Sequence, residues 1–151
     1  MRRKDKEISV KAEIESIIGE SQVCRLALSD EGSPYIVPLC FGYKDHTLYF
    51  HSAKEGKKLE ILKSNNKVCF EFDIGTTIVQ GKTPCDWGMK YRSVVGFGEA
   101  LIVDEPEAKR EALQMITAQY ANGTHAFSDA EIGGIVVIKV YITSMTGKKS
   151  G

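Results

Sequence analysis

The sequence lacks three features that would assign it to a broad class at once. It has no excess of either charge, because its 151 residues hold 20 Lys and Arg against 20 Asp and Glu. A general nucleic-acid partner would need a basic surface, so we expect none. No apolar run approaches the ~20 residues of a membrane span, and the charged start leads into no apolar signal core. We therefore expect a cytoplasmic protein with no membrane partner, folded as a single domain over residues 1–151.

Familiar catalytic and metal-binding motifs are missing as well. All four cysteines lie more than fourteen positions apart and the three histidines are scattered, so the sequence predicts no metal site. It contains no P-loop, no glycine-rich dinucleotide fingerprint and no nucleophile elbow. Cys24, Cys40 and Cys69 fall in strand-like runs, where we expect them to be packed in the core. Cys85, in a loop, is the one candidate reactive thiol.

What the sequence does contain is a succession of short strands. Apolar runs and alternation predict six of them, at 23–28, 34–43, 47–51, 67–74, 91–103 and 135–143. Helical spacing predicts three helices, at 10–18, 54–64 and 106–120. Residues 75–88 are expected to form a loop or an irregular strand.

This order of elements predicts a mainly β fold. Strands that follow one another directly favour an antiparallel sheet over a wound parallel one. Gly96 and Gly98 lie inside the fifth strand and permit the sharp bend that a closed barrel needs. Pro38 cannot donate to a ladder, so its strand is expected at an edge, at a bulge or where the ladder is interrupted.

One segment combines groups that suit a phosphate. A predicted strand ends at His51 and Ser52, and the following loop reaches Gly56, Lys57 and Lys58 at a helix start. The first turn of a helix has free N–H groups and partial positive charge, to which a hydroxyl and two ammonium groups would add. The alternative is that the two lysines are ordinary solvated surface residues. His51 lies directly before this loop, and the sequence does not decide whether its side chain faces a ligand.

Five segments carry a family resemblance when taken in chain order: 24–28, 32–39, 49–53 with 56–58, 65–68 and 91–100. Together they resemble the pyridoxamine 5′-phosphate oxidase-like flavoproteins, and within them the branch that includes the nitroimidazole-resistance reductases. The likeness extends from about residue 7 to residue 149. It implies a six-stranded antiparallel split β-barrel with flanking helices that binds FMN at a homodimer interface.

The resemblance also implies roles for particular residues. Backbone groups along one strand would hold the isoalloxazine, and polar and basic side chains would hold the ribityl chain and phosphate. The implied cofactor-binding residues are Ile36, Val37, Pro38, Leu39, His51, Ser52, Lys57, Lys58, Arg92 and Ser93. His51 would also be the catalytic residue, by hydrogen bonding a substrate or flavin oxygen. Trp87 and Tyr91 would wall the ring or substrate space.

Two departures from the vitamin-forming oxidases shape the functional expectation. The strand that carries basic phosphate-binding residues in those oxidases has none here over 37–42, and their basic C-terminal region has no clear counterpart over 142–148. The sequence therefore favours an FMN-dependent oxidoreductase that reduces a small electrophile such as a nitroimidazole. A flavin-binding carrier or sensor without turnover, and a haem-handling protein on the same barrel, remain open alternatives.

Overall fold

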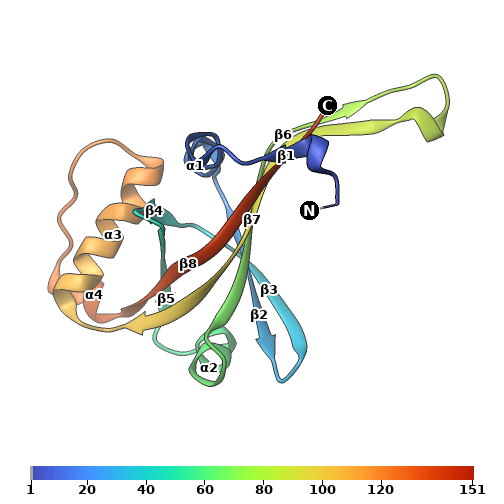
Figure 1. The fold of residues 1–151 in the computed structure, drawn as a ribbon. Coiled ribbons are helices and arrows are strands. Elements are labelled where there is room, and N and C mark those ends of the chain that lie inside the picture. Colours follow the sequence, from blue (N-terminus) through green and yellow to red (C-terminus); the bar gives the residue numbers. More distant parts are fainter. Residues whose placement is uncertain (1) are drawn as a thin grey trace.

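The computed structural model describes residues 2–151, which form one antiparallel sheet with helices around it (Figure 1). The strands are β1 (Glu7–Ile8), β2 (Cys24–Asp30), β3 (Ser33–Leu39), β4 (Gly42–Lys44), β5 (Thr47–Ala53), β6 (Lys67–Val79), β7 (Gly88–Val103) and β8 (Ile135–Ser150). The helices are α1 (Lys11–Glu20), α2 (Lys57–Ser64), α3 (Pro106–Tyr120) and α4 (Asp129–Gly133), with 3-10 turns at Lys4–Lys6 and Pro84–Asp86.

The sheet curls into a barrel that is split between its two edges. Its strand order is β3-β2-β6-β7-β8-β5-β4, with β1 paired to β8. The two edge strands, β3 and β4, are consecutive in the chain, so the backbone crosses from one edge to the other through Cys40 and Phe41. Pro38 lies on edge strand β3, where its missing N–H costs no ladder bond. Of the three placements that the sequence left open for this strand, the structure shows the edge.

The core fills the inside of the barrel. Phe50, Phe70 and Phe72 are fully buried there, with Phe41 4.8 Å from Phe72 between ring centroids. Helices α1 and α2 lie at opposite ends of the barrel (Figure 1) and contribute isoleucines and leucines to this cluster. Helix α3 packs instead on the outside, over β4 and β5, where Ile116 belongs to a second apolar cluster.

Close packing explains the glycines of β7. The ring of Phe70 occupies the space that a Cβ at Gly96 would need, so any larger residue there would displace that ring. Next to it, the register between β7 and β8 shifts at Phe97 and Gly98. These glycines therefore lie at an irregularity of the ladder, as expected of positions that permit a bend or a bulge.

The fold class is confirmed, but the strand count of six is wrong. The predicted strand 34–43 divides into β3 and β4, because Phe41 turns into the core where the chain crosses between the sheet edges. The two-residue β1 adds another strand. Strand β6 also continues to Val79 and β8 to Ser150, because each finds a partner along β7. Residues 75–79 continue β6 past a register shift, which fits the irregular strand expected there, and residues 80–87 form the loop at the tip of this projecting hairpin arm (Figure 1).

The cysteine prediction holds only in part. Cys24 is buried and Cys69 is half-buried, but Cys40 is exposed because it points outward at the edge of the sheet. Cys85 is exposed near the tip of the arm, as predicted. Within residues 2–151, no helix is long and apolar enough to cross a membrane.

Candidate functional site

A cavity of about 410 Å³ lies at the split of the barrel, between β3, β5 and the start of α2. It brings together five of the residues that the sequence singled out: Val37, His51, Ser52, Lys57 and Lys58. Tyr35, Ala53, Glu55 and Gly56 complete its lining. The strand–loop–helix segment predicted to bind phosphate therefore faces β3, which lies more than ten residues earlier in the chain.

Strand β5 positions the polar side chains by alternation. It pairs with β8 throughout, and His51 and Ser52 lie opposite Val137 and Val136. Phe50 points into the core, whereas His51 is exposed at the cavity. Ser52 is buried and belongs to the lining of the same cavity. The ladder fixes the backbone positions of both residues.

The start of α2 presents free backbone donors to the cavity. Gly56 has φ +140°, a conformation that disfavours any larger residue, and its carbonyl accepts from Leu59 and Glu60 at 3.0 and 3.2 Å. Within residues 2–151, no side chain caps this helix. The N–H groups of Lys57 and Lys58 precede those bonded to Gly56, so they remain available to an anion.

The two lysines of the cavity differ in their surroundings. Lys58 is half-buried and takes part in no ion pair within the described chain, and burial lowers the pKa of its ammonium group. Lys57 has two partners: its Nζ lies 3.9 Å from Oδ2 of Asp30 and 5.1 Å from the centroid of the Tyr35 ring. Of the two lysines, Lys58 is therefore the one without an acidic partner. A bound phosphate would supply the negative charge that its ammonium group lacks.

Strand β3 offers its backbone along the same side. It pairs only with β2, so its second edge is not used in the sheet. Ile36 and Pro38 point outward, and Ile36 is 61% exposed, whereas Val37 and Leu39 turn inward and are half-buried. Residues 36–39, which the resemblance assigns to the isoalloxazine, thus form an accessible strand edge. This edge leads away from the start of α2.

The sequence also matches a known protein family. A family model described as pyridoxamine 5′-phosphate oxidase matches residues 10–149, nearly the whole chain. The chain belongs to the pyridoxamine 5′-phosphate oxidase family. No curated protein matches the sequence.

Solved structures of the same fold include flavoproteins. A candidate 5-nitroimidazole antibiotic resistance protein from Bacteroides thetaiotaomicron is 38% identical, with a TM-score of 0.85 over 95% of this chain and 86% of that one. The FAD and heme binding protein from Mycobacterium smegmatis is 19% identical, with a TM-score of 0.86 over 96% and 73%. The flavocytochrome Anf3 from Azotobacter vinelandii is 17% identical, with a TM-score of 0.87 over 100% and 72%. The last two likenesses concern the fold alone.

In this member of the pyridoxamine 5′-phosphate oxidase family, Arg92 and Ser93 lie outside the cavity. Arg92 is opposite Lys149 on β8, twelve residues beyond the position opposite His51. At about 3.3 Å per residue, up to about 40 Å of strand separates Arg92 from His51. Arg92 instead binds Glu20 of α1 at 3.0 Å. One copy of the chain therefore does not unite all ten residues implied by the resemblance.

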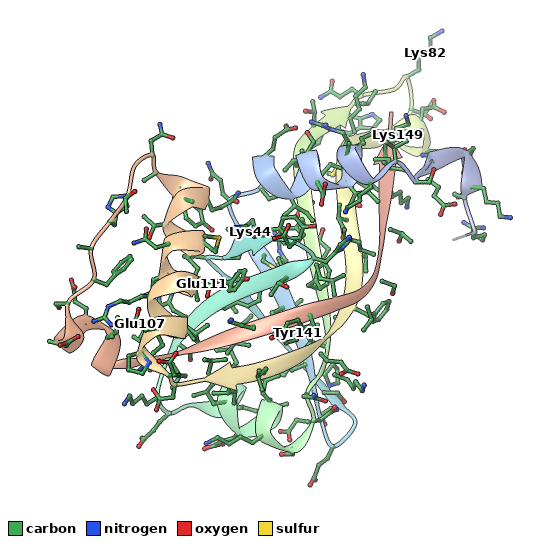
Figure 2. The ribbon with its side chains drawn as sticks, turned by 60° about the vertical axis from the view of Figure 1, so that its left-hand side comes forward. Lys44, Lys82, Glu107, Glu111, Tyr141 and Lys149 are labelled. Atoms are coloured by element: carbon green, nitrogen blue, oxygen red, sulfur yellow. The ribbon has the colours of Figure 1, made fainter. Side chains whose placement is uncertain are left out.

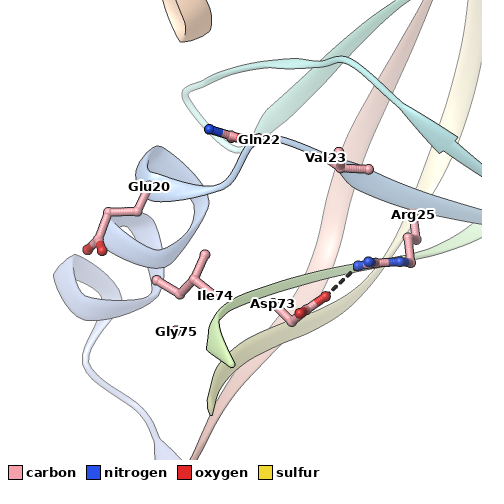
Figure 3. Close-up of a pocket in the computed structure, with 7 residues that line it drawn as sticks. All are labelled: Glu20, Gln22, Val23, Arg25, Asp73, Ile74 and Gly75. Carbon is pink, nitrogen blue, oxygen red and sulfur yellow. Dashed lines mark hydrogen bonds and ion pairs between the residues drawn. The ribbon is translucent and has the colours of Figure 1, made fainter. Parts of the chain in front are cut away.

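A second cavity, of about 450 Å³, lies beside the end of α1 and holds mutually paired charges (Figure 3). Arg25 forms ion pairs with Asp73 and, at 3.0 Å, with Glu71. The charges in this second cavity are paired with one another, whereas the ammonium group of Lys58 has no acidic partner. Within residues 2–151, no three His, Cys, Asp or Glu side chains gather closely enough to hold a metal ion.

Sequence reasoning missed two residues at or beside this cavity. Tyr35 lines the cavity, and Asp30 reaches it through Lys57. The alternation of Tyr35 with Val37 and Leu39 would have indicated the tyrosine, because all three share one face of β3. The Asp30 contact joins segments 27 residues apart, and no local pattern signals it.

Proposed function

We propose that this protein binds FMN in the cavity between β3, β5 and α2 and uses it to reduce a small electrophile such as a nitroimidazole. The observation that carries the proposal is the half-buried, unpaired ammonium group of Lys58 beside the uncapped start of α2. A phosphate monoester would supply the missing negative charge and accept from the free N–H groups. The buried hydroxyl of Ser52 adds a further donor.

The dimensions of the site suit a flavin mononucleotide. With the phosphate at Lys58, the ribityl chain would pass Val37 and Ser52, and the ring would lie along β3 toward Leu39. From Tyr35 to Leu39 the strand spans about 13 Å, at ~3.3 Å per residue. The unused edge of β3 offers backbone donors and acceptors, except at the nitrogen of Pro38.

The bound flavin would supply the electron chemistry, and this chain would supply position and polarity. His51 is exposed at the cavity on the strand that faces β3, so it would donate a hydrogen bond to an oxygen of the substrate or ring. The choice of a nitro compound is supported by the 38% identity to the Bacteroides thetaiotaomicron protein. A carrier or sensor without turnover would use the same residues.

We also propose that two copies pair through the uncovered outer face of the sheet. Val95, Phe97 and Leu101 alternate outward on β7, and Phe97 is 55% exposed. An apolar stripe of this kind on a soluble domain marks an interface. Pairing would allow Arg92 and Ser93 of one copy to approach the flavin of the other.

The decisive test of flavin binding is Lys58→Ala. We expect it to weaken FMN binding at least about tenfold, because a charged hydrogen bond in a half-buried site is lost. Isothermal titration of the full chain measures the affinity. Lys63→Ala is the matched control, because Lys63 is exposed in the last turn of the same helix. Equal FMN affinity in both variants would refute the phosphate assignment.

Turnover has its own test. Anaerobic NAD(P)H should bleach the flavin absorption of the loaded protein, and a nitroimidazole should restore it. Bleaching without recovery would favour the carrier or sensor, and a Soret band in the protein as purified would favour haem.

A further inference from the structure

Lys57 lines the cavity and contacts the β2–β3 turn, whose residues lie outside the lining. Asp30 is the last residue of β2, pairs with Ser33, and lies 3.9 Å from Nζ of Lys57. Lys57 also lies over the ring of Tyr35. The turn between the strands is tight, with φ +49° at Glu31 and +90° at Gly32. Lys57 therefore links the start of α2 to a rigid hairpin at this end of the site.

The direction of β3 fixes where a longer cofactor would go. The strand runs from Ser33 at the turn to Leu39 at the sheet edge. With the flavin ring near Leu39 and the first phosphate at Lys58, anything attached to that phosphate must continue past Tyr35 toward the turn. There it would meet the carboxylate of Asp30 and would have to displace Lys57 from its two partners.

We propose that Asp30, acting with Lys57, makes this site select a flavin mononucleotide over a flavin dinucleotide. The inference rests on the proposed function and deepens it. The first phosphate is attracted by Lys58, which has no acidic partner in the described chain. The second phosphate of a dinucleotide would lie beside Asp30, and two like charges brought close together disfavour the complex. The cation nearest to that position, Lys57, is already shared with Asp30 and Tyr35.

Neutralising Asp30 tests the inference directly. Isothermal titration of the full, flavin-free chain with FMN, FAD and riboflavin gives three affinities for each variant. We expect the wild-type chain to bind FMN at least about tenfold tighter than FAD, and Asp30→Asn to reduce that ratio about tenfold. Glu31→Gln removes an exposed charge from the same turn that is not paired with Lys57, and should leave the ratio within about twofold.

The outcomes separate this inference from the proposal on which it rests. If the wild-type chain binds FAD as tightly as FMN, the selection by Asp30 is wrong while flavin binding stands. If Asp30→Asn and Glu31→Gln give the same ratio, Asp30 is not the selecting residue. If none of the three flavins binds, the proposed function itself fails. Thermal unfolding of each variant verifies the fold, and Asp30→Ser provides a second replacement should the first not fold.

Discussion

The two halves of the outer face of the sheet carry the same alternating apolar pattern, but only one half is covered. Over β5 and the start of β8, Tyr49 and Val137 are buried beneath α3, packed against Ile116. Over β7, Phe97 and Leu101 continue the pattern in the open. Figure 2 shows Tyr141 of β8 on this open side, away from Glu107 and Glu111 of α3. The difference teaches that the fold buries one apolar surface for its stability and leaves an equivalent one exposed, the surface through which we propose that two copies pair.

The largest expected effect is in the covered half. Ile116→Ala should lower the free energy of unfolding by about 3 kcal/mol, because a buried side chain is replaced by a cavity. Urea unfolding of the purified variant measures the loss. Glu111→Ala, on the exposed side of the same helix, should change stability by less than about 0.5 kcal/mol. A loss under about 1 kcal/mol for Ile116→Ala would mean that α3 contributes little to the fold.

The next effect is in the uncovered half. Phe97→Glu should leave each copy folded but weaken the proposed dimer at least about thirtyfold, because a central aromatic anchor is replaced by a charge. Sedimentation measures the mass. Glu107→Lys changes a charge on α3 and should leave the mass unchanged.

Mixing two defective chains makes this comparison sharper. If Arg92 serves the flavin of the other copy, a mixture of Lys58→Ala and Arg92→Ala chains regains a fraction of FMN sites with the wild-type affinity, which neither variant has alone. A mixture without such recovery, or a Phe97→Glu chain of unchanged mass, would contradict pairing through this face.

The smallest expected effect is on stability and comes from the unpaired ammonium group of Lys58 rather than from an apolar surface. Burial holds the pKa of Lys58 below the ordinary value of 10.5, so the unfolded chain retains this proton to higher pH than the folded chain does. The cost to stability is therefore full at neutral pH and disappears as the pH rises through the lowered pKa to 10.5. Lys58→Met should stabilise the flavin-free protein by about 0.5 kcal/mol at neutral pH, a value reduced by solvent screening.

Denaturant unfolding at a series of pH values measures this gain. The advantage of Lys58→Met should shrink as the pH rises, and FMN affinity should fall in the same variant. A variant less stable than the wild type at neutral pH would show that the ammonium group is satisfied within the protein.

Much of the fold was predictable wherever pattern and burial coincide. Val68, Phe70 and Phe72 alternate in the sequence and all point into the core. For 75–79 the sequence left a loop and an irregular strand both open, and the extension at 144–150 could not be found in this way, because its mostly polar residues carry no periodic signal. Both segments are strands because β7 supplies a partner for each. Whether such a partner strand exists depends on residues far away in the sequence, so the local pattern of a segment cannot reveal it.

The residues of the candidate site differ in the same way: those close together in the sequence were predictable, and contacts between distant segments were not. His51, Ser52 and Lys58 were predictable as a group because they adjoin one another in sequence, and the structure places them in one cavity. Asp30 was not predictable, because its contact with Lys57 depends on how the β2–β3 hairpin meets α2. The assignment of Arg92 and Ser93 to the flavin stays a prediction, because it depends on a second copy of the chain.

The short strand β1 ties the two ends of the described chain together. Glu7 is opposite Lys148 and Ile8 opposite Gly147, and both ends lie on the same side of the barrel (Figure 1). A short linker could therefore join them, and new termini could be opened near Lys82 in the exposed arm tip. Such a circularly permuted chain would preserve every strand pairing of the barrel while moving the ends of the polypeptide away from α1.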